Sequence, residues 1–444
     1  MPAPSADATY YDEAAETMPR AQLDEMQLER LQTTCELAYE HAPLIRERWD
    51  EAKVKPSDIK TVDDFRERVP FIDKDAIREF REARGDPFGG LLCLPIADLT
   101  GINSTSGTTG NPTLTAERWG EDPRRPNAMA RDLWHMGGRP GDYFSVILFT
   151  FRGPFYTLPL TLGMTPVIYD YDVHEVERLM RQSLRYRPTL LYNLGGVLIS
   201  TVADVAARTG LDPKDCFASY RGIVWAGEPL GTRARTLAEL WGLPLYQHST
   251  AGDASPCFEC SERDGMHVWE DTALVEGIDP HAYDHRDATP VTARRERCEL
   301  VATALSDFVA PLVRYRSDDL VQLDREPCPC GRTHVRLWTV GRKGDEVVVD
   351  GQSVMPIDVW SAVEEVEPCR LGLFQIVRPR RELDVLRLRV GYDDVGDDRL
   401  GALADEIRAV VSAAVGIEPE VELVRNEVLL RQGPPHKIPR VTKT

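Results

Sequence analysis

The feature that most constrains the fold is a regular alternation of short apolar segments with helical patterns between residues 143 and 248. The apolar segments are rich in β-branched and aromatic residues and occupy residues 143–149, 163–169, 188–193, 222–226 and 243–248. Helical patterns lie between them at residues 174–186, 199–209 and 232–240. Strands that alternate with helices in this way indicate a parallel sheet that is covered on both faces.

The pattern changes on either side of this region. Residues 19–49 and 62–84 keep helical spacing, and Pro43 interrupts the first of these stretches. Residues 299–303 and 312–323 predict a smaller, twisted β region. Beyond Gly341 the chain has the pattern of an α+β module, with strands expected at 346–349, 373–377 and 385–391 and helices at 357–364 and 398–415. We therefore expect an α/β protein with an N-terminal domain of residues 1–341, which has parallel-rich sheets and a small β region, and an α+β C-terminal domain of residues 342–444.

Length and charge exclude several classes of protein. The 444 residues exceed what one core usually supports, which favours two domains. No apolar run approaches the roughly 18 residues of a membrane span, and no signal-peptide pattern opens the chain. A net charge of −19, from 53 basic and 72 acidic residues, disfavours a nucleic-acid partner. We expect a cytoplasmic protein with no membrane partner, and the nine scattered cysteines do not indicate a disulfide framework.

A small polar loop at residues 105–113 is the strongest candidate for an anion site. It reads Thr105-Ser106-Gly107-Thr108-Thr109-Gly110-Asn111-Pro112-Thr113. Backbone N–H groups in such a loop can turn inward around a phosphate, and the hydroxyl groups add donors. The loop lacks the Gly-Lys-Ser/Thr ending of a Walker motif. A flexible linker is the alternative for this composition, but the loop ends in a proline within a long globular stretch.

This loop resembles the phosphate loop of adenylate-forming enzymes, and the chain is most similar to the phenylacetate–CoA ligase family within that superfamily. The resemblance runs over nearly the whole length in ordered matches. They are Glu16 to Arg20, Gln27 to Leu31, Val69 to Lys74, Ala226 to Pro229, Arg314 to Leu320, and Gly341-Arg342 with Asp345, Gly351 and Pro356.

The resemblance implies an ATP-dependent, AMP-forming ligase. Such an enzyme activates an aryl or related carboxylate as its acyl-adenylate and then transfers it to coenzyme A. The C-terminal domain would be mobile, turning about residues 342–345 between the two half-reactions. The implied ATP-binding residues are Thr105, Ser106, Gly107, Thr108, Thr109, Gly110, Gly227, Glu228, Pro229, Tyr246, Asp319 and Arg342. A plain β–α turn is the alternative for the Gly-Glu-Pro segment, and Asp318 competes with Asp319, one of the two being expected to be a solvated surface acid. For Arg342, a linker charge is the alternative.

The resemblance assigns the catalytic roles to Lys437, Thr250 and Arg342. Lys437 matches the lysine that bridges the substrate carboxylate and the α-phosphate, although His436 stands where the family usually has glycine. Thr250 stands where the family has the glutamate that helps to hold Mg²⁺. The metal carboxylate could therefore be lost or moved to Asp253 or Glu259. Asn111 likewise replaces the lysine that is common in the phosphate loop.

A second set of residues has the character of a zinc site. Cys260, His267, Cys328 and Cys330 supply thiolates and an imidazole, which are the usual ligands of a closed structural Zn²⁺ site. This spacing also resembles a zinc site in some relatives of the family. Cys257 competes with His267 for one position, and buried free thiols are the alternative. We take the other five cysteines to be ordinary core residues: Cys35, Cys93, Cys216, Cys298 and Cys369.

The acid pocket and the acceptor are less constrained. The resemblance places the acid near Phe149, Phe151, Phe155, Tyr156, Ala226 and His248. An aromatic acid fits this set, and so does a polar acid held by His248. A carrier-protein thiol, an amine or another nucleophile could replace coenzyme A in a secondary-metabolic enzyme. A nucleotide-binding homologue that has lost turnover is a further alternative, suggested by Thr250 and Asn111, and an assembly of two copies is left open.

Overall fold

The computed structural model describes residues 4–104, 114–118, 127–148, 155–227, 230–379, 382–393, 395–432 and 439–442. The chain forms two compact units, each built from three segments. Unit 1 contains Met1–His135, Phe149–Leu162 and His248–Lys343, and unit 2 contains Met136–Leu148, Gly163–Gln247 and Gly344–Thr444. The chain passes from unit 1 to unit 2 for the last time after Lys343. This point lies one residue beyond Arg342, where the sequence predicts the domain boundary. The assignment of residues 1–341 and 342–444 to separate domains stays a prediction.

The N-terminal helices of unit 1 begin and end where the sequence supplies caps. Thr61 accepts a hydrogen bond from the Asp64 backbone N–H and donates its own backbone N–H to the Asp64 carboxylate, which is a capping box. Asp73 caps the next helix, which ends at Gly85 in the left-handed conformation. Pro43 ends one helix and occupies the first turn of another. The helices of this unit are α1 (Glu13–Glu16), α2 (Arg20–His41), α3 (Pro43–Ala52), α4 (Val62–Arg68), α5 (Lys74–Arg84) and α6 (Ala128–His135), with 3₁₀ turns at Pro56–Asp58, Ile96–Asp98, Phe155–Thr157 and Pro159–Leu162.

The β region of unit 1 is antiparallel and extends well beyond the two expected strands. Its strands pair in the order β10-β11-β12-β13-β9-β8, and the end of β7 (Leu245–Ala251) pairs with β8. The bounds are β8 (Ser255–Glu259), β9 (Met266–Val268), β10 (Ala273–Ile278), β11 (Arg297–Ala304), β12 (Tyr315–Asp324) and β13 (Arg336–Arg342). A separate pair, β1 (Gly101–Ser104) and β2 (Leu114–Glu117), brings Ser104 opposite Leu114 and so fixes both ends of the segment 105–113.

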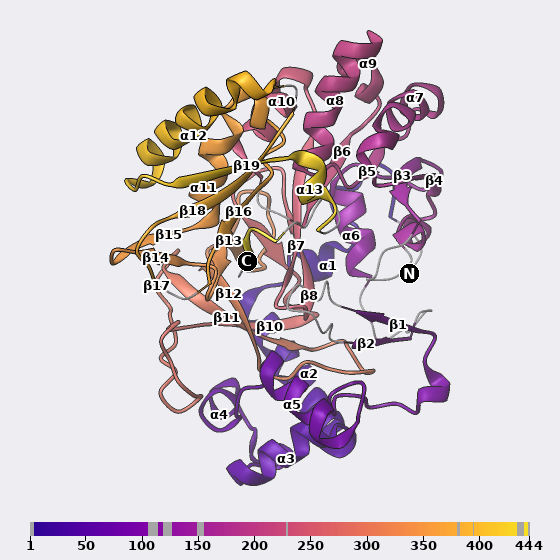
Figure 1. Ribbon diagram of the computed structural model, residues 1–444. Coiled ribbons are helices and arrows are strands. Elements are labelled where there is room, and N and C mark those ends of the chain that lie inside the picture. The colour runs from indigo at the N-terminus through magenta and orange to yellow at the C-terminus, as the bar shows by residue number, and fades with distance from the viewer. Residues whose placement is uncertain are drawn as a thin grey trace. The chain divides into compact units, whose positions relative to one another are not determined.

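Unit 2 begins with the expected parallel sheet (Figure 1). Strands β3, β4, β5 and β6 are parallel neighbours in the order β4-β3-β5-β6, with α7 between β4 and β5 and with α8 and α9 between β5 and β6. Their bounds are β3 (Tyr143–Ile147), β4 (Thr165–Tyr169), β5 (Leu190–Tyr192) and β6 (Gly222–Ala226), with α7 (Val176–Tyr186), α8 (Gly196–Thr209), α9 (Pro213–Phe217), α10 (Thr232–Trp241) and a 3₁₀ turn at Val173–Glu175. The α/β class is confirmed.

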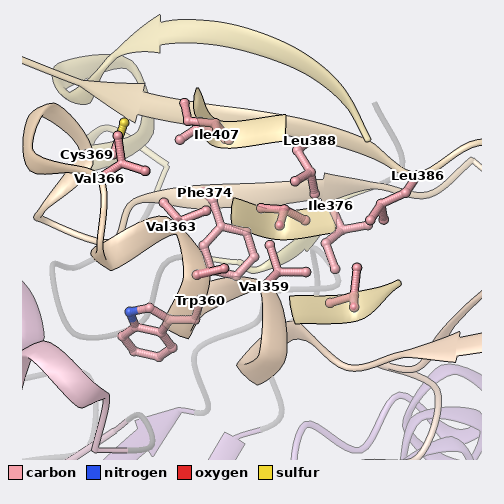
Figure 2. Close-up of a cluster of buried hydrophobic side chains, with 14 of the residues drawn as sticks. Val359, Trp360, Val363, Val366, Cys369, Phe374, Ile376, Leu386, Leu388 and Ile407 are labelled. Carbon is pink, nitrogen blue, oxygen red and sulfur yellow. The ribbon is translucent and has the colours of Figure 1, made fainter. Parts of the chain in front are cut away.

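The rest of unit 2 is an α+β region with its own core, shown in Figure 2. Helix α11 directs Val359 and Val363 toward Phe374 and Ile376 of β16, Trp360 lies at the edge of the same cluster, and all five are buried. Removing such side chains from water stabilises this region by about 1.5–3 kcal/mol each. Two sheets, β15-β14-β17 and β19-β18-β16-β20, complete it. The bounds are β14 (Val347–Val349), β15 (Gln352–Val354), α11 (Pro356–Glu364), β16 (Phe374–Val377), β17 (Glu382–Leu383), β18 (Arg387–Tyr392), α12 (Leu400–Val415), β19 (Glu420–Arg425), α13 (Asn426–Leu430) and β20 (Val441–Thr442), with 3₁₀ turns at Glu367–Cys369 and Asp397–Arg399. Within the described ranges, no helix has the combination of length and apolar character that crossing a bilayer requires.

Candidate active site

Two neighbouring strands of unit 1 bring Asp319 and Arg342 together. These residues are direct partners in the antiparallel register of β12 and β13. Arg342 Nε donates a hydrogen bond of 3.0 Å to Asp319 Oδ1, and both side chains keep partial access to solvent. Arg342 therefore engages the carboxylate that the resemblance assigns to the ribose. The pair presents one acceptor group and one cation at the same point of the sheet.

A buried ion pair fixes the strand that carries Asp319. Arg316 donates to both carboxylate oxygens of Glu299 on β11, at 2.6 and 2.7 Å, and Lys343 Nζ lies 3.1 Å from the same carboxylate. The Glu299 side chain has no exposed surface. A bidentate pair of this kind fixes both the distance between the two side chains and their relative orientation, because both hydrogen bonds must form together.

Asp318 lies beside this network in a conformation that few non-glycine residues adopt. Its φ is +65°, and its carbonyl accepts a hydrogen bond of 2.7 Å from the Lys343 N–H. Burial raises the pKa of the Asp318 carboxyl, and the Glu299 carboxylate raises it further. Both Asp318 and Asp319 are half-buried, and the expectation that one of them is a solvated surface acid stays a prediction.

The turn after β7 places a carboxylate next to Thr250. Thr250 is exposed near the end of the strand, and its hydroxyl donates to Asp253 Oδ1 over 3.3 Å. Gly252 has φ +56°, and a Cβ there would stand 3.0 Å from the Ala302 Cβ and 3.4 Å from the Ser317 Cβ. The turn thus packs against β11 and against the residue that precedes Asp318. Burial raises the pKa of the Tyr315 hydroxyl, and the carboxylates of Asp253 and Asp319 raise it further, so both acids lie near the same group.

Glu259, the other acid considered for the metal, has a different environment. It is buried on β8 opposite Met266, and Arg263 Nη1 lies 3.3 Å from its carboxylate. This ion pair belongs to the strand that leads to the cysteine cluster. Asp253 is therefore the acid that lies at Thr250.

His248 stands two residues before Thr250 on the same face of β7 and contacts a buried acid. Its Nε2 lies 3.5 Å from Oδ2 of Asp132, a residue of α6 whose side chain has no exposed surface. The other Asp132 oxygen accepts a hydrogen bond of 2.8 Å from Trp269 Nε1. Sequence reasoning named His248 but missed Asp132 and Trp269. No sequence motif marks an aspartate inside a helix or a tryptophan after a strand as partners of a distant histidine.

Unit 2 holds the residues assigned to adenine and to part of the acid pocket. Ala226 ends β6, and its backbone exchanges two hydrogen bonds, of 2.8 and 3.0 Å, with the Asn193 side chain. Gly227 follows with φ +97°, which a residue with a side chain would rarely adopt. Tyr246 lies on β7, within its first half.

Several predicted residues lie outside the described part of the chain. They are Thr105, Ser106, Gly107, Thr108, Thr109, Gly110, Phe149, Phe151, Glu228, Pro229 and Lys437. Of the expected aryl contacts, Phe155 and Tyr156 are described and form a 3₁₀ turn of unit 1, where Tyr156 is partly exposed.

The structure brings the four predicted zinc ligands together. The donor atoms of Cys260, His267, Cys328 and Cys330 all lie within 4.8 Å of one another. Hydrogen bonds from Cys260 and His267 lower the pKa of the Cys330 thiol. His267 Nδ1 lies 3.0 Å from the His334 carbonyl, which sets Nδ1 as the protonated nitrogen and leaves Nε2 for the cluster. The cluster could hold a tetrahedral metal ion.

Cys257, the rival ligand, lies outside this cluster. It is fully buried on β8, where it pairs with Ser249 and Val268. The five remaining cysteines, expected to be core residues, are all buried: Cys35, Cys93, Cys216, Cys298 and Cys369.

The N-terminal segment packs on the cysteine cluster. Tyr10 donates its hydroxyl to the Cys330 carbonyl at 2.8 Å. Arg332 pairs with Glu16 at 2.7 Å, with both side chains buried. These contacts join the N-terminal segment of the chain to the segment that carries Cys328 and Cys330.

Comparisons with known proteins agree with this architecture. No protein-family model matches the chain. A phenylacetate-coenzyme A ligase of Thermus thermophilus is 30% identical and aligns with 97% of this chain and 96% of its own. Among solved structures, 2-hydroxyisobutyryl-CoA ligase in the postadenylation state with 2-HIB-AMP superposes with a TM-score of 0.80, at 28% identity, over 99% of this chain and 94% of that chain. The same enzyme in an open conformation with 2-HIB-AMP and CoA gives a TM-score of 0.66, at 28% identity, over 99% of this chain and 96% of that chain.

Proposed function

The chain belongs to the phenylacetate–coenzyme A ligase family, and we propose how its own residues divide the work of that family's reaction. It is an ATP-dependent, AMP-forming ligase that activates an aryl or related carboxylate and transfers the acyl group to coenzyme A. The observation that carries the residue assignments is the pairing of Asp319 with Arg342 across β12 and β13.

Nucleotide binding would be divided among three groups of residues. Asp319 would accept hydrogen bonds from the ribose hydroxyls, since a carboxylate has room for two donors. Arg342 would orient Asp319 and face the phosphates. Gly227, Glu228 and Pro229, with Tyr246, would contact the adenine, and Thr105, Ser106, Gly107, Thr108, Thr109 and Gly110 would hold the β- and γ-phosphates. The β1–β2 pairing supports this last assignment, because it holds both ends of that loop together.

The chemical step needs little covalent participation from the protein. A carboxylate oxygen attacks the α-phosphorus, pyrophosphate leaves, and the thiolate of coenzyme A then displaces AMP from the acyl group. Lys437 would neutralise charge on the carboxylate and the α-phosphate during the first displacement, and a positioned cation of this kind has its largest effect on the transition state. Phe149, Phe151, Phe155, Tyr156, Ala226 and His248 would form the acid pocket.

Asp253 is the residue best suited to replace the family's metal-binding glutamate. Mg²⁺ takes hard oxygen ligands, usually one or two carboxylates together with phosphate oxygens. The Asp253 carboxylate already touches the Thr250 hydroxyl and lies in the same turn. When bound, Mg²⁺ would neutralise charge on the triphosphate. Asp253 would supply a carboxylate for it, and Thr250 would fix the carboxylate's orientation.

A structural zinc ion is proposed for Cys260, His267, Cys328 and Cys330. The donor set has the softness that Zn²⁺ prefers, and four protein ligands leave no open position for catalysis. Its role would be to hold the hairpins of unit 1 and the N-terminal segment that packs on them.

Several broader assignments rest on sequence and charge. The excess of acidic residues favours a cytoplasmic protein without nucleic-acid or membrane partners. A carrier protein, an amine or another nucleophile could serve as acceptor in secondary metabolism, and an assembly of two copies stays a prediction.

Isotope exchange between pyrophosphate and ATP tests the adenylation step. With Mg²⁺ and a panel of aryl acids, we expect exchange by the native chain and a loss of about 10²–10³-fold in Lys437→Ala, because the variant lacks a cation at the transition state. The exposed Lys214 provides a matched control, and Lys214→Ala should exchange at the native rate. Nucleotide binding without exchange by the native chain would instead support a homologue that has lost turnover.

Elemental mass spectrometry tests the zinc assignment. Protein purified without chelators should contain about one zinc per chain. Cys260→Ser and Cys328→Ser should lose it, and Cys257→Ser should keep it, because Cys257 is buried nearby but outside the cluster. A substoichiometric content in the native protein, or loss from the Cys257 variant alone, contradicts the assignment.

Moving the carboxylate from position 253 to position 250 tests whether Asp253 holds the metal. We expect Asp253→Asn to raise the Mg²⁺ concentration for half-maximal exchange by about tenfold or more, and Thr250→Glu in the same chain to restore it. Binding of Mn²⁺ to the complex with a non-hydrolysable ATP analogue, measured by electron paramagnetic resonance, should change in parallel. Asp350→Asn is the control, since Asp350 is also an exposed aspartate with positive φ. If Asp253→Asn reaches half-maximal exchange at the same Mg²⁺ concentration as the native chain, Asp253 does not hold the metal.

A further inference from the structure

Two buried side chains join the carboxyl ends of β4, β5 and β6 in unit 2. Tyr169 is the last residue of β4, Asn193 directly follows β5, and Ala226 is the last residue of β6. Strand β3 lies between β4 and β5 in the sheet, so the Tyr169 side chain spans the end of β3 to contact Asn193. Tyr169 and Asn193 are each only 4% exposed, so their hydrogen bonds form away from water.

Asn193 continues the pairing of β5 with β6 beyond the last backbone register pair, which is Tyr192 with Val224. Two residues beyond Val224, the Ala226 carbonyl accepts a hydrogen bond from the Asn193 amide nitrogen at 2.8 Å. The Ala226 N–H donates to the Asn193 amide oxygen at 3.0 Å. One side chain therefore satisfies both backbone groups of the residue that ends β6.

Tyr169 holds Asn193 in the position that this contact requires. The Tyr169 hydroxyl accepts a hydrogen bond from the Asn193 backbone N–H at 2.9 Å. It also lies 2.7 Å from the Tyr192 carbonyl oxygen and 2.9 Å from the Asn193 carbonyl oxygen. Burial raises the pKa of the Tyr169 hydroxyl well above its ordinary value, so the group keeps the hydrogen that it donates to these carbonyls. The backbone that carries the Asn193 amide is thus held by a second buried side chain.

The contact with Ala226 determines how the chain enters the turn at Gly227. The peptide between these two residues is planar and trans, so the Gly227 N–H points opposite to the Ala226 carbonyl that Asn193 binds. Gly227 then adopts φ +97°, and no side chain restricts its backbone. The direction of the turn therefore depends on the hydrogen bonds that Ala226 makes.

We propose that Asn193, supported by Tyr169, positions this turn and thereby sets the preference of the enzyme for adenine over other nucleobases. This inference rests on the proposed function, in which Gly227 and the two residues after it contact the adenine. Adenine carries a hydrogen-bond donor at the ring position where guanine carries an acceptor. A backbone group that is held in one place distinguishes these bases, whereas a group that is free to turn accommodates either. Asn193 acts through Ala226, so it is a positioning residue and not a catalytic one.

Pyrophosphate exchange with ATP and with GTP tests this role. The two nucleotides are compared by kcat/KM at a saturating concentration of the acid that the native chain activates best. The native chain should prefer ATP by about 10²-fold or more. In Asn193→Leu, which keeps the branching of the side chain but has no hydrogen-bonding group, the ratio should fall by about tenfold or more, because the KM for ATP rises. Tyr169→Phe should lower the ratio by less, since the Asn193 amide remains.

Asn426→Leu is the matched control. Asn426 is 2% exposed and lies in the same unit, and its amide nitrogen donates to Asp393 at 2.7 Å. This variant also loses a buried amide hydrogen bond, but away from the β5–β6 pairing, so it should keep the native ratio. A loss of stability alone would lower the rates with both nucleotides together, and thermal unfolding followed by circular dichroism would report it separately. If Asn193→Leu does not fold, Tyr169→Phe decides the outcome.

An unchanged ratio in Asn193→Leu overturns the proposal, and so does an equal fall in Asn426→Leu. If the ratio changes in Asn193→Leu but not in Tyr169→Phe, the supporting role of Tyr169 is refuted. A native chain that exchanges equally with ATP and GTP overturns the proposal too, because it has no base preference to set. These results leave the adenylating activity intact. A native chain that exchanges with neither nucleotide for any acid refutes the proposed function, and the positioning role falls with it.

Discussion

The antiparallel register between β12 and β13 is the constraint on which the account of the nucleotide site depends. It sets Asp319 opposite Arg342, and a slip of one strand by one residue would put the two side chains on opposite faces of the sheet. The buried pair of Arg316 with Glu299 holds β12 against β11 and so protects this register. The turn with Gly252 packs against Ser317 on the same strand, which brings Asp253 within the same neighbourhood. The proposed ribose and metal contacts are therefore linked to the strand pairing through residues 315–319.

Buried ion pairs recur throughout unit 1. Besides Arg316 and Glu299, buried pairs join Arg131 to Asp271, Arg314 to Glu276 and Arg332 to Glu16. Such pairs contribute little net stability, because desolvation offsets most of the Coulomb attraction, but losing one partner costs about 3–5 kcal/mol. Their main effect is to fix the relative positions of the segments that they join. They connect segments far apart in the sequence, including the N-terminal segment and the cysteine cluster.

Sequence alone predicted the parallel sheet of unit 2 well, because its strands are apolar runs and its helices are amphipathic. The antiparallel strands of unit 1 were harder to predict. Strand β10 is wholly buried yet contains Glu276, and β13 begins and ends with arginines that are paired in the fold. Strand β19 was missed although Val421 and Leu423 alternate with glutamates, which is a readable signal. The four clustered zinc ligands could be named from spacing and resemblance. The contact of Asp132 with His248 could not be predicted, since only tertiary packing brings the two residues together.

A crystal structure with a non-hydrolysable ATP analogue tests the central claim most directly. The account predicts that both ribose hydroxyls donate to the Asp319 carboxylate, with Arg342 still in contact with Asp319 or with the phosphates. The paired strands β12 and β13 would then form the nucleotide site without changing their register. A nucleotide bound with its ribose away from Asp319, or no bound nucleotide at a saturating concentration, would contradict it.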